Sequence, residues 1–154
     1  MSGLQPDERG ILTTCQACGK RNRLSYARLD KRSRCGHCSA DLRPPADPVE
    51  VPSGVVFDAL IRESSLPVVI DFWAPWCGPC RMVAPELAKA ATATSGEYLI
   101  VKVNTEALPE IGDRFRIQSI PTMAVFRHGL EVTRTSGARP AADIVAFVRS
   151  AVAP

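Results

Sequence analysis

The feature that most constrains this chain is a pair of cysteines, Cys77 and Cys80, placed where an apolar segment gives way to a helical pattern. The segment Val68–Trp73 is almost wholly apolar and rich in β-branched residues, which predicts a buried strand. After the cysteines, apolar residues recur at helical spacing at Met82, Val83, Leu87 and Ala91. The order is therefore strand, tight turn and helix, with both sulfur atoms at the start of the helix.

This placement predicts redox chemistry. The backbone N–H groups of a helix's first turn are unpaired and the helix dipole is positive there, so a thiolate at Cys77 is stabilised. Cys77 is therefore the predicted nucleophile. Cys80 lies one helical turn further on, roughly 5–6 Å away between Cβ atoms. At that separation Cys80 can form a disulfide with Cys77, or resolve a mixed disulfide that Cys77 has formed.

A Cys-x2-Cys pair is equally typical of half a zinc site. A structural zinc site needs four ligands, and the other four cysteines of the chain form a set of their own. Neither His37 nor His128 is paired with another histidine at ligand spacing. We therefore interpret Cys77 and Cys80 as a redox pair rather than as metal ligands.

The first 43 residues carry the other four cysteines in two Cys-x2-Cys pairs, at Cys15, Cys18, Cys35 and Cys38. Four thiolates in two knuckles supply a closed tetrahedral shell, which predicts one structural Zn²⁺. A unit this small buries too little apolar surface to fold alone, so zinc binding should supply its folding free energy. His37 lies between two of the cysteines, but with four thiolates present it is not a predicted ligand.

Two β-prone segments, Ile11–Thr14 and Asn22–Tyr26, accompany the knuckles, so residues 1–43 are predicted to form a zinc ribbon. The ribbon is basic: seven Lys or Arg residues stand against one Asp between Lys20 and Arg34, whereas residues 51–154 carry ten residues of each sign. A solvated charged face is the commoner explanation, and steering of acidic partner proteins is an alternative. Nucleic-acid binding is not favoured, because Tyr26 is the only aromatic residue there.

A proline-rich linker is predicted over residues 44–50, and a second domain over 51–154. Val49–Val51 is a candidate first strand, and Ser53 is a candidate cap of the following helix. After the cysteine helix, the pattern predicts a strand over Tyr98–Asn104, a short helix over Leu108–Arg114, a hairpin of Thr122–Phe126 with Leu130–Thr135, and a last helix opened by Pro140. The fold class is therefore α/β, with a β-α-β-α-β-α-β-β-α order.

The N-terminus is polar and lacks an apolar core region, and no apolar run approaches the roughly 18 residues that a membrane span needs. We therefore expect neither a signal peptide nor membrane insertion, and a cytoplasmic location. In a reducing compartment, six cysteines indicate metal binding and catalysis rather than structural disulfides.

The ten residues DFWAPWCGPC, from Asp71 to Cys80, are similar to the active-site motif of the thioredoxin family, and the resemblance covers about residues 50–152. It implies the thioredoxin fold, a central mixed sheet flanked by helices. It also implies protein-disulfide reduction by a Cys77/Cys80 exchange cycle. No G-x-G-x-x-G sequence is present, so this chain is expected to bind no nucleotide. The resemblance suggests re-reduction by thioredoxin reductase, a flavoprotein that uses NADPH.

The resemblance also implies roles for residues outside the cysteine pair. Asp71 would lie beneath the dithiol and relay the proton of Cys80, although a structural Asp satisfied by hydrogen bonds is the alternative. Lys102 would modulate that titration, unless it is an ordinary strand-end lysine. Ile120-Pro121 matches the family's cis-proline loop, which pairs with an extended substrate segment. The apolar docking surface for substrate would comprise Trp76, Ala74, Ile120 and Gly137.

A tetracysteine ribbon joined to a WCGPC domain resembles the bacterial thioredoxin 2 type, and the two motifs account for all six cysteines. Two alternatives remain. One is a disulfide oxidant or isomerase on the same fold, and the other is a zinc-ribbon adaptor whose second domain only binds. The Gly-Pro between the cysteines and the cytoplasmic signals favour a reductant over an oxidant, and the intact cysteine pair argues against an adaptor.

Overall fold

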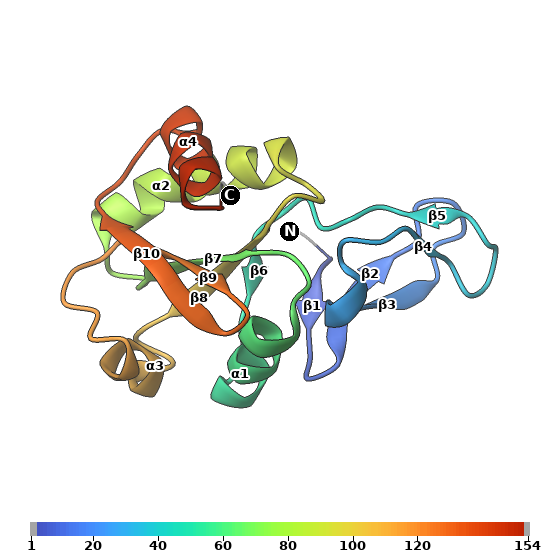
Figure 1. The fold of residues 1–154 in the computed structure, drawn as a ribbon, viewed down its shortest axis with the longest axis horizontal. Coiled ribbons are helices and arrows are strands. Elements are labelled where there is room, and N and C mark those ends of the chain that lie inside the picture. The colour runs from blue at the N-terminus through green and yellow to red at the C-terminus, as the bar shows by residue number, and fades with distance from the viewer. Residues whose placement is uncertain (1–2, 153–154) are drawn as a thin grey trace.

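The computed structural model describes residues 3–152, which form a small N-terminal module beside a larger helix–sheet domain (Figure 1). The module consists of β1 (Gln5–Pro6), β2 (Gly10–Thr14), β3 (Arg21–Ser25), the short 3-10 helix η1 (Tyr26–Arg28), β4 (Ser33–Arg34) and β5 (Asp41–Leu42). The larger domain consists of β6 (Val49–Glu50), α1 (Gly54–Glu63), β7 (Val68–Trp73), α2 (Gly78–Ala93), β8 (Leu99–Asn104), α3 (Pro109–Arg114), β9 (Thr122–Arg127), β10 (Leu130–Ser136) and α4 (Ala141–Val152).

The sheet of the larger domain has the strand order β10-β9-β7-β8-β6. Strands β6, β8 and β7 run parallel, while β9 runs antiparallel to β7 and β10 antiparallel to β9. The predicted α/β class, mixed sheet and element order are therefore confirmed. The central strand β7 ends directly before the turn that leads into α2, so the middle of the sheet fixes where the cysteine pair lies.

Alternate residues of the sheet pack against different helices. Val69 of β7 lies in a core shared with α2 and α4, whereas Ile70 and Phe72 lie in a core shared with α1 and α3. The α1 side holds an aromatic cluster in which the ring of Phe115 lies 5.2 Å from that of Phe126 and 5.7 Å from that of Phe57. Helices cover both faces of the sheet (Figure 1), so the apolar run of β7 is buried on both sides.

The helix boundaries follow local chemistry. Ser53 caps α1 as predicted, because its Oγ accepts a hydrogen bond from the N–H of Val56 at 3.3 Å. Met82 lies on α2 as its helical spacing predicts, but it is 72% exposed. Val83 and Leu87 face the core, and Met82 is rotated by about 100° from its neighbour Val83, which turns it outward.

The segment 44–50 is not a free tether. Its last two residues form the edge strand β6. Its carbonyl groups accept hydrogen bonds from the end of α2, Ser95 Oγ to Pro44 O at 3.3 Å and Thr92 Oγ1 to Ala46 O at 3.1 Å. The linker is thus fixed along one side of the larger domain.

The N-terminal module also contributes to the core on the α1 side. Tyr26 is 1% exposed, and together with Leu29 it belongs to the same buried cluster as Leu60 and Leu66. The backbone N–H of Ser65 donates to the carbonyl of Tyr26 at 2.9 Å. The two parts of the chain are therefore joined by apolar contacts as well as by the linker.

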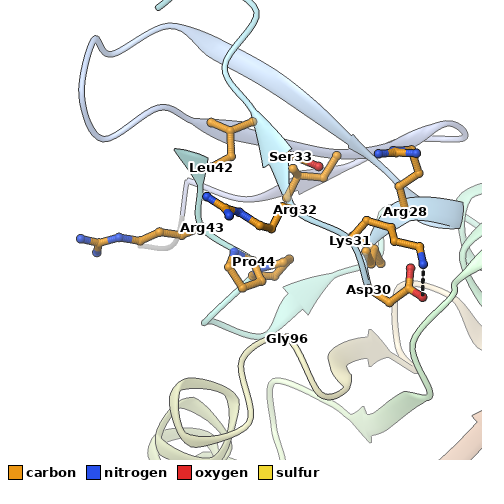
Figure 2. A pocket seen from close by; sticks show the side chains of 12 residues that line it. Arg28, Asp30, Lys31, Arg32, Ser33, Leu42, Arg43, Pro44 and Gly96 are labelled. Carbon is orange, nitrogen blue, oxygen red and sulfur yellow. Dashed lines mark ion pairs between the residues drawn. The ribbon is translucent and has the colours of Figure 1, made fainter. Parts of the chain in front are cut away.

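A cavity of about 230 Å³ lies where the module, the linker and the loop after α2 meet (Figure 2). Leu42 and Pro44 contribute to its apolar lining, and Arg28, Arg32 and Arg43 contribute positive charge. Within residues 3–152, no helix is both long and apolar enough to cross a membrane.

Truncation of Phe57 tests the packing of the α1 face. Phe57 is fully buried, so Phe57→Ala should lower the free energy of unfolding by about 3–5 kcal/mol through lost burial and a residual cavity. Val55 lies on the same helix but is 61% exposed, so Val55→Ala should change it by less than about 0.5 kcal/mol. Denaturant unfolding of both variants measures the difference, and equal losses would contradict the described packing.

Candidate active site and cysteine cluster

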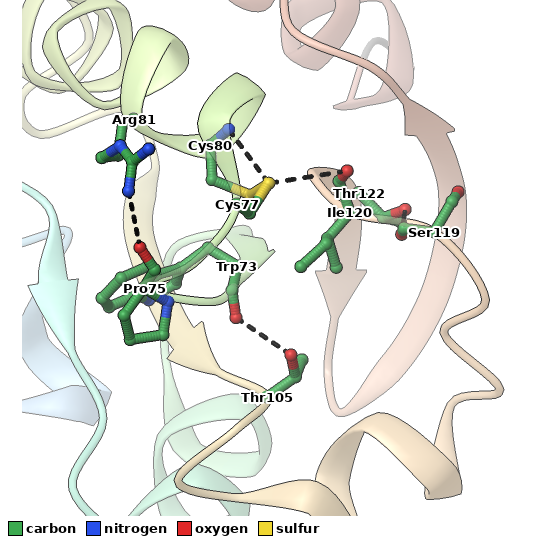
Figure 3. The surroundings of a disulfide bond; sticks show 9 residues. All are labelled: Trp73, Pro75, Cys77, Cys80, Arg81, Thr105, Ser119, Ile120 and Thr122. Carbon is green, nitrogen blue, oxygen red and sulfur yellow. Dashed lines mark hydrogen bonds between the residues drawn. A yellow bond between two sulfur atoms is a disulfide. The ribbon is translucent and has the colours of Figure 1, made fainter.

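Cys77 and Cys80 form a disulfide at the N-terminus of α2, with their Cα atoms 5.2 Å apart (Figure 3). Cys77 is the N-cap of the helix, and its Sγ accepts a hydrogen bond from the backbone N–H of Cys80 at 3.2 Å. The backbone N–H of Cys77 in turn donates to the carbonyl of Ala74 at 3.1 Å. A sulfur held in this way is stabilised as a thiolate once the disulfide is reduced.

The loop opposite the disulfide contains a cis peptide bond between Ile120 and Pro121. The carbonyl oxygen of Ile120 lies 3.8 Å from Cys77 Sγ, and Figure 3 shows the loop facing the pair. On the far side of the loop, the N–H of Gly137 donates to the carbonyl of Pro121 at 2.9 Å, and Thr122 Oγ1 donates to Ser119 O at 2.6 Å. The loop is thus fixed against the redox pair.

A shallow cavity of about 210 Å³ lies beside the redox pair. Trp76 and Ile120 line it as the sequence predicted, and Trp76 is 67% exposed. The other lining residues were not predicted; they come from α3 and its flanking loops, and include Thr105, Gly112, Ile117 and Ser119.

The other two predicted docking residues, Ala74 and Gly137, do not line this cavity. Ala74 is fully buried, so its side chain is not part of an exposed surface, and the residue acts through its backbone carbonyl under Cys77. Gly137 is hydrogen-bonded to the carbonyl of Pro121 in the cis-proline loop, and its part in a docking surface stays a prediction. The apolar character of Ala74 reflects core packing at the end of β7 and not contact with a ligand.

Asp71 is the one charged residue in β7, and it is 1% exposed. Among the described residues, neither of its carboxylate oxygens has a hydrogen-bond partner. Burial raises the pKa of Asp71 to about 7, against the opposing charge of Lys102 and with a smaller contribution from Glu50. A buried carboxyl group with such a pKa can exchange a proton near neutral pH.

Lys102 is paired with Asp71 in the register of β7 and β8, as the predicted modulating role requires. Its Nζ lies 4.6 Å from the centroid of the Trp73 ring. Glu50, which the sequence analysis missed, accepts a hydrogen bond from Trp73 Nε1 at 3.2 Å. The available signal was its position between Val49 and Val51, which puts Glu50 on the opposite face of the strand from two core residues.

The four remaining cysteines converge in the N-terminal module. Their Sγ atoms all lie within 4.8 Å of one another, with 3.7 Å between Cys15 and Cys38 and between Cys18 and Cys35. The two knuckles have matching turns: the N–H of Gly19 donates to Cys15 O, and the N–H of Ser39 donates to Cys35 O. Both turns end in a residue with positive φ, 79° at Gly19 and 65° at Ser39.

The donor set fits a tetrahedral metal ion. Four sulfurs about 2.3 Å from a central Zn²⁺ would stand about 3.8 Å apart, close to the two sulfur–sulfur distances of 3.7 Å. Cys35 Sγ also accepts hydrogen bonds from Asn22 Nδ2 at 3.3 Å and from the N–H of His37 at 3.4 Å, which stabilise a thiolate. The cluster can hold a metal through its four cysteines, and His37 contributes its backbone rather than its ring.

Asp71→Asn should change how stability depends on pH. The pKa of Asp71 is about 7 in the folded chain and about 4 when unfolded, so between these values the folded chain binds more protons and its stability falls as pH rises. The Asn variant lacks this term. Its free energy of unfolding should be higher than that of the parent by an amount on the order of 2–4 kcal/mol at pH 8. Near pH 4 the two free energies of unfolding should be equal. Denaturant unfolding across this pH range is the measurement, and parallel pH curves would contradict the burial of an ionisable Asp71.

Comparison with known proteins agrees with this geometry. The family model described as Thioredoxin matches residues 48–150. Thioredoxin C-3 of Corynebacterium nephridii is 39% identical over 129 residues, which is 83% of this chain and 86% of that protein. Thioredoxin 1 of Synechococcus elongatus is 48% identical over 84 residues, covering 54% of this chain and 78% of that protein.

Solved structures show the same likeness. The crystal structure of chloroplastic thioredoxin z superposes with a TM-score of 0.64 at 30% identity, over 70% of this chain and 96% of that one. A variant thioredoxin from Halobacterium salinarum superposes with a TM-score of 0.65 at 22% identity, over 72% of this chain and 96% of that one. At this identity the likeness supports the fold alone. The fold is the thioredoxin fold. The chain therefore belongs to the thioredoxin family, and its Cys77–Cys80 pair is the redox centre of a thiol-disulfide oxidoreductase that acts as a protein-disulfide reductase.

Proposed function

We propose that the two cysteines have unequal roles, with Cys77 as the nucleophile and Cys80 as the resolving thiol. The observation that carries this assignment is the position of Cys77 as N-cap of α2, with its Sγ accepting the N–H of Cys80. Cys77 also faces the cis-proline loop, where a substrate sulfur would arrive. Cys77 and Cys80 are similarly buried, at 4% and 3% exposed, so the position at the helix cap and not burial distinguishes them.

The reaction then has two exchanges. The Cys77 thiolate attacks one sulfur of a substrate disulfide, forming a new S–S bond and releasing the other substrate sulfur as a thiolate that takes up a proton from solvent. Cys80, after losing its proton, attacks the sulfur of Cys77, which forms the Cys77–Cys80 bond and releases the second substrate thiolate. Two electrons pass from the dithiol to the substrate.

Asp71 is the group we assign to the proton of Cys80. It is buried on the face of the sheet that α2 covers, and its carboxylate lacks another partner among the described residues. Its pKa of about 7 lies between those of an ordinary carboxyl and an ordinary thiol. The carboxylate can therefore accept the thiol proton during the second exchange and return it to water afterwards.

Trp76 and Ile120 form the surface that we expect to receive the substrate chain. Both line the cavity beside Cys77, and the cis-proline loop presents its backbone there. An extended segment on either side of the substrate disulfide can pair with that backbone, while the indole of Trp76 covers it from the opposite side. We therefore expect disulfide-containing proteins to be the substrates. Thioredoxin reductase, the family's usual partner, is the proposed electron donor that restores the dithiol. The proposed location of this cycle is the cytoplasm.

Serine variants separate the two cysteines. Cys77→Ser should abolish disulfide reduction, because it removes the thiolate that makes the first bond. Cys80→Ser leaves the first exchange possible but not the second, so mixed disulfides with substrate proteins should accumulate. Mass spectrometry of complexes formed with a reporter disulfide protein measures this. If the Cys77→Ser protein forms the stable complexes instead, the assigned roles are reversed.

For the N-terminal module we propose one structural Zn²⁺ bound by Cys15, Cys18, Cys35 and Cys38. This is supported by sulfur spacing that suits a tetrahedral site and by the N–H donors to Cys35. Such an ion would contribute its binding free energy to the folding of the module. It would have no catalytic role, because a closed four-thiolate shell leaves no open coordination position. The domain boundaries we propose are residues 1–43 for the ribbon, 44–50 for the linker and 51–154 for the thioredoxin domain, with the last two linker residues adding strand β6 to the large sheet.

Removal of residues 1–45 tests this division. The purified full-length chain should bind one zinc, and the truncated chain none. The truncated chain should still reduce a small generic disulfide, because both redox cysteines and every strand of the large sheet remain. It should also melt at a lower temperature, because Tyr26 and Leu29 no longer cover the α1 side of the core. Zinc bound to the truncated chain, or complete loss of its disulfide reduction, would contradict the two-part reading.

A further inference from the structure

Three ionisable residues form a row across the parallel part of the sheet. In the strand register Asp71 of β7 is paired with Lys102 of β8, and Lys102 is paired with Glu50 of β6. The flanking residues Val101 and Val49 lie in the core on the α1 side. Because side chains alternate along a strand, the row lies on the opposite face, which α2 covers. The helix α2, whose N-terminus carries the redox cysteines, therefore lies on the same side of the sheet as the row.

The row is held together through the indole ring of Trp73. Glu50 accepts a hydrogen bond from Trp73 Nε1 at 3.2 Å, and the ammonium of Lys102 lies over the same ring, 4.6 Å from its centroid. Among residues 3–152, no ion pair within 4.0 Å joins Lys102 to either carboxylate. The ammonium group of Lys102 therefore lies on the face of the Trp73 ring, between the carboxylates of Glu50 and Asp71, and forms an ion pair with neither.

We propose that Glu50 is a positioning residue for the redox reaction: it anchors the Trp73 ring that carries Lys102, and its negative charge offsets Lys102 so that Asp71 keeps its proton affinity. The proposal rests on the role given to Asp71 above and adds a residue to it. Glu50 touches neither substrate nor sulfur, and acts on the second exchange only through Lys102 and Asp71.

The electrostatic balance at Asp71 supports this. Burial raises the pKa of Asp71 to about 7, Lys102 lowers it, and Glu50 raises it. On the other side β9 offers Met123 opposite Asp71, and α4 offers apolar Ile144 and Val148 to this core. The charged groups that act on Asp71 are thus Lys102 and Glu50.

Glu50 remains able to carry charge at the sheet edge. Partial burial of its carboxylate against the indole raises its pKa, while the Trp73 hydrogen bond, the charge of Lys102 and the N–H of Asn104 oppose that rise. The residue as a whole is solvent-accessible, which limits the effect of burial. Without Glu50, no negative charge would offset the effect of Lys102 on Asp71. The pKa of Asp71 would then be lower, which makes its carboxylate a weaker base for the Cys80 proton.

Two substitutions of Glu50 in the full-length, zinc-loaded protein test whether its negative charge acts on Asp71. Glu50→Gln keeps an oxygen that can accept the indole N–H but removes the charge, and Glu50→Asp keeps the charge. Glu63→Gln is the matched control, because Glu63 is an exposed glutamate at the end of α1. The carboxyl ¹³C signal of Asp71 is titrated by NMR in the reduced state. With one charge removed two strands away, Glu50→Gln should lower the pKa of Asp71 by roughly half a unit or more.

The second exchange supplies an independent readout. The reduced protein is mixed with a nitrothiobenzoate disulfide, which releases one chromophore when Cys77 attacks and a second when Cys80 resolves. The rate of the second release, followed against pH, should shift its acid limb to lower pH in Glu50→Gln by the same amount as the NMR titration. Glu63→Gln should follow the parent, and Glu50→Asp, which keeps the charge, should shift the acid limb by less than Glu50→Gln does.

The outcomes separate this inference from the proposed function. If Asp71→Asn leaves the pH profile of the second release unchanged, the proton role of Asp71 fails, and the Glu50 proposal with it. If Asp71→Asn alters the profile but Glu50→Gln does not, only the Glu50 proposal fails. Equal shifts in Glu50→Gln and Glu50→Asp would show that packing at the strand edge matters rather than charge, and would also overturn it.

Discussion

The hydrogen bond from the Cys80 N–H to Cys77 Sγ is the contact on which the rest of the site depends. It requires a helix that begins at residue 78, and that start is fixed by the end of β7 and by the Cys77 N–H bonded to the Ala74 carbonyl. The same helix start brings Cys77 against the Ile120 carbonyl. A thiolate, its resolving partner and the substrate loop are therefore assembled by one strand-to-helix turn at the centre of the sheet.

Two Cys-x2-Cys patterns in one chain have different outcomes because their backbones differ. Cys77 precedes an α-helix, so its sulfur receives a first-turn N–H and its partner lies one turn on. Cys15 and Cys35 instead begin tight turns that close on a residue with positive φ, after which the chain reverses into the next strand. Those turns point four sulfurs toward a common centre. The distinction lies in the residues after the second cysteine, which continue a helical pattern in one case only.

Much of the fold was predictable because strong local signals agreed with the tertiary structure. The apolar run of β7, the Ser53 cap and the hairpin of β9 with β10 all appear within a residue or two of their expected limits. Helical spacing alone does not decide which of two adjacent apolar residues faces inward, and in α2 Val83 is buried whereas Met82 is exposed. Ala74 was misassigned because a small apolar residue beside an active site can equally be part of the core. Glu50 was missed because its partners lie 23 and 52 positions away in sequence, on strands whose register no local pattern gives.

The place of the N-terminal module has a further consequence for the sheet. Strand β6 is only two residues long and is one of the two edges of the five-stranded sheet, and β1 lies against it (Figure 1). A bare strand edge offers unpaired N–H and C=O groups as a template for pairing with another molecule. In this chain the cysteine-bearing module shields that edge, while β10 closes the other side with a charged outer strand. If the zinc that we propose for the module is lost, we expect edge-to-edge association to reduce solubility before the dithiol chemistry changes.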